Sequence, residues 1–530
     1  MEAADARPQR RRLALPLLAA AASYLALHAA ALGVVPPGVA SDPVIEAMRG
    51  LRLVLERRFE VLTFSIGPSA ETLYLYPLGA SVATLGPTRL ALALPSALAA
   101  TAVLALLALV VRRARPALSL AVPLLLGASS VWLFHYGQVG LRAISAPLFV
   151  LGAVLLLDDT EGSGLAKRPF AAGALLGLSI YAYSGCRLLP LAYAAHLSWR
   201  TLRRAAPRAA LSREALRVGA GFLVASIPNL LFLLRAPSLF LDRGYYVARG
   251  DLADKLVNVL ATFLLPFGYP DRYRVWRGAG HVFDATGVAL TASDLDPLDL
   301  VAGPLAVLGL AVLLFGKGRR ISNGLSFLVA VWLTGGVLLG AFGPGLTRLL
   351  ILLPAWLVFA ALGAEALLAR APALRLPLVA FLFLWLGLRA DAYVRTFGPS
   401  TGSRWEFHEA ITAMAERARD LTGQGTRVLV VSRRGRDVFK YFGWRRIEQI
   451  YHVPQPSGVP EDGDVPLHGF RPGVVLVERT PDLDRWAPLG GVAGPSPKPA
   501  LYAEYHLPDA DPSPPTVRSN LWRLWSPIAW

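Results

Sequence analysis

The sequence has little cysteine and little charge. Among its 530 residues there is a single cysteine, Cys186, and only 17% of the residues are charged. One cysteine excludes any disulfide within the chain, so cysteine pairing does not indicate a redox compartment. Because 54% of the residues are apolar and the mean hydropathy is +0.47, the small charged fraction argues against an ordinary soluble domain.

Several catalytic and transport motifs are also missing. The chain contains no Walker loop, no G-x-S-x-G elbow and no H-E-x-x-H pair, so ATP-driven transport and the familiar hydrolase types lack support. It shows no repeat of fixed period and no inverted repeat typical of a transporter. The formal net charge of +17 lies mainly in short loops rather than on a basic face interleaved with aromatics, which argues against a nucleic-acid partner.

What the chain does have is a series of long apolar runs. Such runs predict a polytopic α-helical membrane protein embedded in the lipid bilayer, with about eleven transmembrane helices. The first run follows RPQRRR and is too long for a signal peptide, so we expect an uncleaved first helix. Two further apolar segments, 71–86 and 256–267, are expected to be interfacial or re-entrant. The predicted helices lie near 13–35, 89–111, 117–135, 143–157, 169–184, 188–200, 218–235, 300–316, 321–342, 346–368 and 374–390.

Loop charge predicts the orientation in the cytoplasmic (inner) membrane. RPQRRR places the N-terminus in the cytoplasm, and alternate loops that are short and basic then fall on the same side. The opposite side receives external loops 36–88 and 236–299. It also receives the stretches HYGQVGLR (135–142), SGCR (184–187) and GPGLTR (343–348), and the C-terminal tail. Most polar features that topology does not explain lie on this external side.

The composition changes to mixed polar sequence after about residue 390. A helical spacing at 404–421 and β-rich runs at 426–432 and 473–479 predict a small soluble α/β domain. We therefore divide the chain into a membrane domain, 1–390, and an extracytoplasmic domain, 391–530.

The first external loop holds three carboxylates of interest, Asp42, Glu46 and Glu71. Asp42 follows the first helix closely, and a carboxylate shielded there could accept a proton from an acceptor hydroxyl. Alternatively Ser41 or Asp42 caps a helix that starts at Pro43. If 43–57 is helical, Glu46 shares a face with Asp42.

Arg142, Arg187 and Arg348 each precede a predicted helix on the external side, where the positive-inside rule disfavours them. Guanidinium groups bind phosphate bidentately and stay charged, so three arginines on one face predict an anionic ligand. The alternative is that each arginine separately reaches lipid headgroups.

Metal binding has weaker signals. His281 and Asp284 are spaced as two potential ligands or substrate contacts, and DLDPLD (294–299) could bind a divalent cation. Two ligands without a third do not define a metal site, and helix capping explains at least one carboxylate of DLDPLD. We therefore assign no metal ligand and no certain cofactor. Binding of a divalent cation is the one alternative that the sequence leaves.

The order of several segments resembles bacterial polyprenyl-phosphate-dependent glycosyltransferases of the GT-C fold, in the group of glycosyltransferase family 39 and the protein O-mannosyltransferases. The segments are PPGVASDPVIEAMRG, ETLYLYPLGASVATLGPTRLALALPSAL, HYGQVGLRAISAPLF, GLSIYAYSGCRLLPL and GPGLTRLLILLP. They lie within residues 13–390. The family has Asp-Glu where this chain has Asp42-Pro43, and Ser-Arg where it has Gly137-Gln138.

The resemblance implies a sugar transfer from a polyprenyl-phosphate donor to a protein, lipid or glycan acceptor at the outer face of the cell membrane, with inversion. It implies that Asp42 is the general base, that the arginines contact the donor phosphate, and that Tyr181 and Tyr183 belong to the site. A transporter or lipid flippase that uses the same arginines for a phosphate headgroup is the alternative. Transporters place charged groups near the middle of the membrane, whereas these groups gather at one interface.

Overall fold

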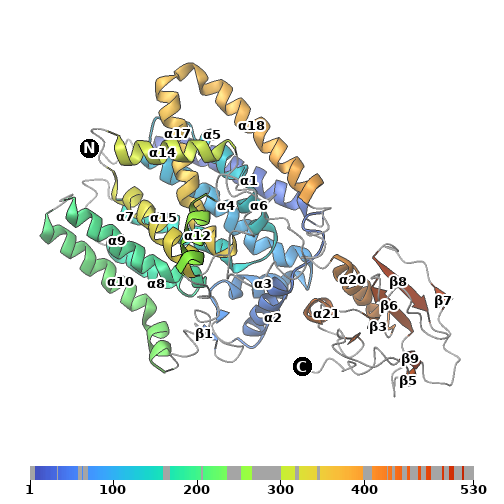
Figure 1. Cartoon of the computed structure of the whole chain (residues 1–530). Coiled ribbons are helices and arrows are strands. Elements are labelled where there is room, and N and C mark those ends of the chain that lie inside the picture. The colour runs from blue at the N-terminus through green and yellow to red at the C-terminus, as the bar shows by residue number, and fades with distance from the viewer. Residues whose placement is uncertain are drawn as a thin grey trace.

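We describe the fold from a computed structural model of the chain. The structure describes residues 6–32, 34–57, 62–63, 70–158, 168–203, 207–235, 252–264, 300–316, 321–342, 346–397, 409–426, 428–431, 436–443, 450–453, 464–466, 473–478, 492–493, 501–506 and 516–518. Figure 1 shows a large helical bundle and, beside it, a smaller part that contains strands.

A helix lies at each of the eleven predicted positions. The bundle comprises α1 (Ala6–Ala31), α4 (Arg89–Ala114), α5 (Ala121–Ala128), α6 (Val131–Gln138), α7 (Ser145–Leu157), α8 (Arg168–Ser179), α9 (Leu189–Leu202), α10 (Arg208–Arg235), α14 (Ala302–Phe315), α15 (Asn323–Phe342), α17 (Leu353–Arg370) and α18 (Arg375–Ala392). Within the described residues, five helical stretches are long and apolar enough to cross a bilayer: Arg89–Ala114, Arg208–Leu231, Asn323–Ala341, Thr347–Arg370 and Pro372–Arg395. The chain is therefore a helical membrane protein, and the number of crossings stays a prediction.

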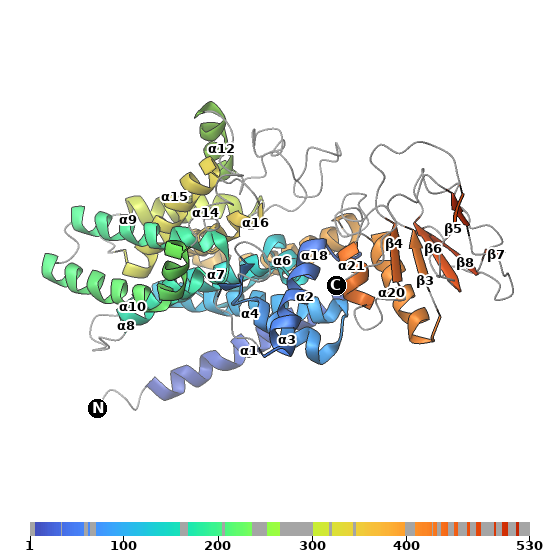
Figure 2. The same ribbon diagram turned by 90° about the horizontal axis from the view of Figure 1, so that it is seen from below.

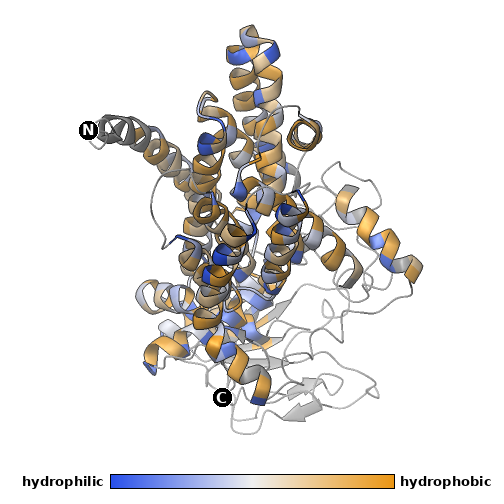
Figure 3. Ribbon diagram, turned by 90° about the vertical axis from the view of Figure 1, so that its left-hand side faces the viewer, coloured by the Kyte–Doolittle hydropathy of each residue, from blue (hydrophilic) through white to orange (hydrophobic). Residues whose placement is uncertain are grey.

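Burial separates a central helix from a peripheral one. Nearly all of α17 is buried inside the bundle, whereas α18 exposes most of its apolar side chains, including Phe383 and Leu384. An exposed apolar face of this kind has to be covered by lipid or by another protein, so α18 lies at the periphery of the bundle. Figure 3 shows that apolar residues predominate along the bundle helices.

Two predicted helices are interrupted. The predicted helix 117–135 breaks at Ser129 and Ser130, and the Ser130 hydroxyl accepts a hydrogen bond from the Leu133 amide, which caps α6. Helix α6 then continues to Gln138, so HYGQ is helical rather than part of an external turn. Serine offers the backbone a competing partner, which is why the break falls there. Similarly, a one-turn helix α16 (Leu346–Leu349) and a 3-10 turn precede α17.

The first external loop folds into two packed helices, α2 (Ser41–Leu55) and α3 (Leu75–Leu85), linked through the short strands β1 (Leu62–Thr63) and β2 (Ala70–Glu71). Gly50 and Gly79 face each other where the helices meet, and a Cβ on either would overlap the backbone of the other helix. Glycine at both positions thus allows the close approach that fixes α2 on α3.

The C-terminal part contains α/β structure. Its five-stranded sheet has the order β4-β3-β6-β8-β7, in which β4, β3 and β6 run parallel and β8 is antiparallel to both of its neighbours, β6 and β7. The elements are α20 (Glu409–Gly423), β3 (Val428–Val431), α21 (Arg436–Gly443), β4 (Ile450–Val453), β6 (Val474–Glu478), β7 (Val492–Ala493) and β8 (Tyr502–His506), with a separate pair β5 (Asp464–Pro466) and β9 (Thr516–Arg518). Figure 2 shows this part at the end of the molecule that carries α2 and α3, and α21 contacts α2.

Candidate functional site

Arg142 lies between two buried carboxylates. Its Nη1 is 3.1 Å from Glu46 Oε1, and its Nε is 3.0 Å from Glu71 Oε2. The three side chains are 10%, 8% and 2% exposed, respectively. Burial of charges is costly unless they are paired, and one guanidinium here compensates two carboxylates. We call Glu46, Glu71, Arg142 and Arg187 the charge cluster.

Three separate segments supply Glu46, Glu71 and Arg142. Glu46 comes from α2 and Glu71 from β2, while Arg142 opens a 3-10 turn before α7. That turn follows Gly140, which has a positive φ of 77°. Glycine adopts this backbone conformation without the steric cost that other residues would have. Elements far apart in the sequence therefore place one arginine against the first external loop.

Arg187 joins the cluster more loosely. Its Nη2 is 3.8 Å from Glu71 Oε1, and its side chain is 27% exposed. It lies in a 3-10 turn, Ser184–Leu188, that precedes α9. The Leu73 amide donates to the Tyr181 carbonyl at 3.0 Å, which ties the segment after Glu71 to the segment before this turn.

Tyr183 connects the cluster to Arg348. Burial raises the pKa of the Tyr183 hydroxyl above its ordinary value, and the positive charges of Arg348 and Arg142 oppose that shift. Arg348 is half-buried in α16, and its neighbour Thr347 accepts a hydrogen bond from the Tyr136 hydroxyl at 3.3 Å. Arg142, Arg187 and Arg348 thus gather around Tyr183 and Glu71, each in a short helical turn before a bundle helix.

Asp42 lies in the first turn of α2, one turn before Glu46. The side chain is exposed, and its negative charge acts on both Glu46 and Arg142. Neither Ser41 nor Asp42 is the N-cap that the capping interpretation predicted, because the helix begins at Ser41 and its N-cap is Ala40, which makes no side-chain capping hydrogen bond. Helix α2 does place Asp42 and Glu46 four residues apart on one face, as predicted.

The environment of Glu46 favours its protonated form. Burial raises the pKa of this carboxyl from 4.5 to about 7, while the Arg142 guanidinium lowers it and Asp42 and Glu71 raise it. A carboxyl with a pKa near neutrality can hold or release a proton under physiological conditions. Sequence spacing placed Glu46 near Asp42, but only the packing of α2 against the turn at Arg142 accounts for this shift.

The other predicted residues divide into two groups. The Tyr181 hydroxyl accepts from the Asn229 backbone amide of α10 at 3.0 Å, so it ties the turn after α8 to α10. His281, Asp284 and the DLDPLD stretch lie outside the described residues. Among the residues that the structure does describe, no group of three or more histidine, cysteine and carboxylate side chains could hold a metal ion.

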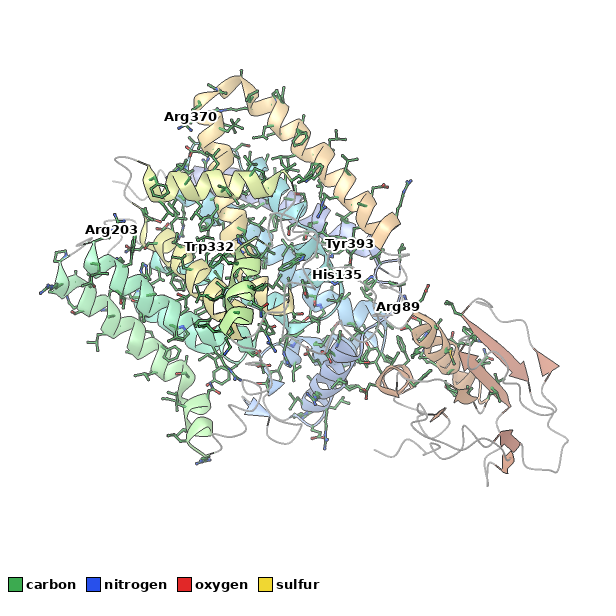
Figure 4. All side chains as sticks on the ribbon, viewed as in Figure 1. Arg89, His135, Arg203, Trp332, Arg370 and Tyr393 are labelled. Atoms are coloured by element: carbon green, nitrogen blue, oxygen red, sulfur yellow. The ribbon has the colours of Figure 1, made fainter. Side chains whose placement is uncertain are left out.

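Polar contacts that the sequence did not predict lie on the bundle side of the site. His135 Nδ1 is 2.9 Å from the Tyr393 hydroxyl, and the Gln138 amide donates to the His28 carbonyl at 2.8 Å. Figure 4 shows His135 and Tyr393 together near the middle of the bundle. These contacts join α6 to α1 and to the end of α18. The cluster of polar residues in HYGQ was the only sign of these contacts in the sequence. The partners, Tyr393 and His28, are more than one hundred residues away along the chain, so the sequence did not identify them.

Comparison with solved structures identifies the fold. The chain matches ArnT from Cupriavidus metallidurans bound to undecaprenyl phosphate with a TM-score of 0.52 and 11% identity, over 93% of this chain and 98% of that one. The apo form of the same protein matches equally well, with a TM-score of 0.52, 11% identity and coverage of 94% and 98%. The chain has a GT-C fold. No protein-family model matches it, and no curated protein does.

The GT-C fold confirms the resemblance drawn from the sequence at the level of architecture. The match with ArnT extends over nearly the whole chain, so it includes the C-terminal part as well as the bundle. Membership of family 39 stays a prediction, as do the roles of the individual site residues.

Proposed function

We propose that the chain is an integral membrane glycosyltransferase that uses a polyprenyl-phosphate-linked sugar as donor. The observation that carries this proposal is the GT-C fold shared with ArnT, a protein crystallised with undecaprenyl phosphate. The charge cluster supports it independently, because it gathers carboxylates and arginines at one end of the bundle. The acceptor is a protein, lipid or glycan at the outer face of the cytoplasmic membrane.

Asp42 is the general base in this proposal. Its carboxylate takes the proton of the acceptor hydroxyl as that oxygen bonds to the anomeric carbon of the donor sugar. The bond from that carbon to the phosphate oxygen breaks at the same time, and polyprenyl phosphate leaves with the electron pair. Attack opposite the leaving group inverts the anomeric configuration. The exposure of Asp42 supports this role, since a base has to reach the acceptor.

The arginines stabilise the departing phosphate. Negative charge grows on this group as the bond breaks, so fixed cations nearby favour the transition state over the ground state. Arg187 and Arg348 are more exposed than Arg142, and the Arg187 contact with Glu71 is the longest in the cluster. We therefore assign the phosphate contact to Arg187 and Arg348, with Arg142 behind them as a buried positive charge that also holds Glu46 and Glu71.

A reconstitution experiment separates this function from lipid transport. Purified protein is placed in liposomes with undecaprenyl-phosphate hexose and pentose donors, together with lipid, peptide and glycan acceptors. A transferase releases undecaprenyl phosphate and attaches the sugar to one acceptor class. Movement of intact donor between leaflets, without release of undecaprenyl phosphate from any donor, would instead indicate a flippase and overturn the proposal.

A further inference from the structure

Arg89 joins the C-terminal domain to the first external loop. Its Nε and Nη2 donate to Glu416 Oε1 and Oε2 at 2.8 and 3.0 Å, and its Nη1 donates to the Pro37 carbonyl at 2.9 Å. The two charged side chains are 15% and 29% exposed. Figure 4 shows Arg89 at the edge of the bundle facing α20. One guanidinium thus holds a helix of the C-terminal domain and the backbone just before α2.

The position of Arg89 in its helix strengthens this interpretation. Arg89 is the first residue of α4, where the positive end of the helix dipole disfavours a cation. Its bidentate pairing with Glu416 compensates for that unfavourable location, and such pairs fix orientation as well as distance. The geometry therefore indicates a specific tertiary contact rather than an incidental surface charge.

Two further hydrogen bonds join the C-terminal domain to the segments on either side of the Arg89 contact. The Val39 amide donates to Thr412 Oγ1 at 3.1 Å, and Thr412 is fully buried on α20. The Tyr441 hydroxyl, from α21, donates to the Thr88 carbonyl at 2.9 Å, next to Arg89. The C-terminal domain therefore contacts both the irregular segment that leads into α2 and the residue just before α4. Asp42 lies three residues after Val39.

We infer that the C-terminal domain positions Asp42 for catalysis through Arg89, Glu416 and Thr412, which act as positioning residues. This inference rests on the proposed function, because it assumes that Asp42 is the base. Without these contacts, residues 37–41 lose the two side-chain hydrogen bonds, from Arg89 to Pro37 and from Val39 to Thr412, that restrain the chain just before α2 begins. A small displacement of a reacting group lowers the rate while it leaves donor binding by Arg187 and Arg348 intact.

The test compares Glu416→Gln and Thr412→Val with Asp420→Asn in the full-length protein in lipid nanodiscs. Asp420 lies on the same helix, and its exposed pair with Arg419 serves as the matched control. Hydrogen exchange of peptides covering 36–44 is measured first, since it does not depend on activity. Sugar transfer is measured next, with kcat and the KM for the undecaprenyl-phosphate sugar determined separately.

We expect faster exchange at 36–44 in Glu416→Gln and Thr412→Val, with β3 and α17 unchanged and Asp420→Asn equal to the parent. We expect kcat to fall about tenfold or more while the donor KM changes less than about twofold.

Unchanged exchange at 36–44, or faster exchange spread equally through β3 and α17, would overturn the positioning role. A parent protein with normal exchange but no transfer with any donor would instead refute the proposed function, while the exchange data still decide whether the contact restrains the loop. Faster exchange with unchanged kcat would show that the restraint does not serve catalysis, and would also overturn the inference.

Discussion

Replacing Arg142 by methionine tests the charge cluster most severely. Methionine keeps much of the side-chain volume and removes the charge that compensates both Glu46 and Glu71. These carboxylates are 8% and 2% exposed, so water cannot replace the lost guanidinium. Breaking a buried pair by removing one partner costs about 3–5 kcal/mol. We expect a loss of this size in the free energy of unfolding at pH 8.

Arg52→Met is the matched control. Arg52 also pairs with a glutamate of the first external loop, Glu56, at 2.7 Å, but its side chain is 60% exposed. An exposed pair of this spacing contributes about 0.3–0.5 kcal/mol. Unfolding in mixed detergent micelles, followed by tryptophan fluorescence, compares both variants with the parent.

A second substitution that removes the excess negative charge of the cluster checks this explanation. Adding Glu71→Gln to Arg142→Met removes one uncompensated carboxylate, so we expect the double variant to be more stable than Arg142→Met alone. The loss in Arg142→Met is also expected to be smaller at pH 5, where Glu46 is protonated. If Arg142→Met costs no more than Arg52→Met, or if Glu71→Gln does not improve it, the buried ion pairs do not hold this part of the molecule.

Two further predictions concern the same external loop. Because the folded-state pKa of Glu46, about 7, lies above the ordinary 4.5, the native protein keeps a proton that the unfolded chain releases. The stabilisation from Glu46 is therefore complete below about pH 4 and is lost as the pH rises to about 7. Glu46→Gln is expected to flatten this part of a stability-versus-pH curve, and an unchanged slope would contradict the burial argument. Gly79→Ala, which forces a Cβ into the backbone of α2, is expected to lose about 1–3 kcal/mol. Gly387→Ala in α18, where nothing lies within 4 Å of the added atom, is expected to gain up to about 1 kcal/mol. Equal thermal denaturation of the two alanine variants would argue against close packing of α2 on α3.

Apolar runs and loop charge predicted the bundle well because helix formation in a membrane depends on local composition. Helices lie at all eleven predicted positions, from α1 to α18. The break at Ser129 and Ser130 escaped prediction, since hydropathy varies little through it and the hydroxyls of both serines bond to the backbone where the helix is interrupted. Local caps depend on single side chains, which a hydropathy average does not resolve.

The sequence predicted which residues lie at the site but not which of them pair. The predicted residues Glu46, Glu71, Arg142 and Arg187 do meet, because all of them flank one end of the bundle. Which arginine pairs with which carboxylate depends on tertiary packing, and the sequence did not predict that Arg142 lies between two carboxylates. The Arg89 contact with Glu416 joins residues 327 positions apart. No local pattern in the sequence indicates such a pair, because tertiary packing alone brings the two residues together.

The most direct test of the account is release of undecaprenyl phosphate by the parent and by Asp42→Asn under identical conditions in nanodiscs, with Asp391→Asn as control. Asp391 is exposed and pairs with Arg395 at the end of α18, so its substitution leaves the site untouched. The account predicts turnover by the parent and by Asp391→Asn, with inversion at the anomeric carbon, and a loss of about 100-fold or more in Asp42→Asn. An Asp42→Asn variant as active as the parent would contradict Asp42 as the base, and no release by the parent from any undecaprenyl-phosphate sugar would contradict the proposed transfer itself.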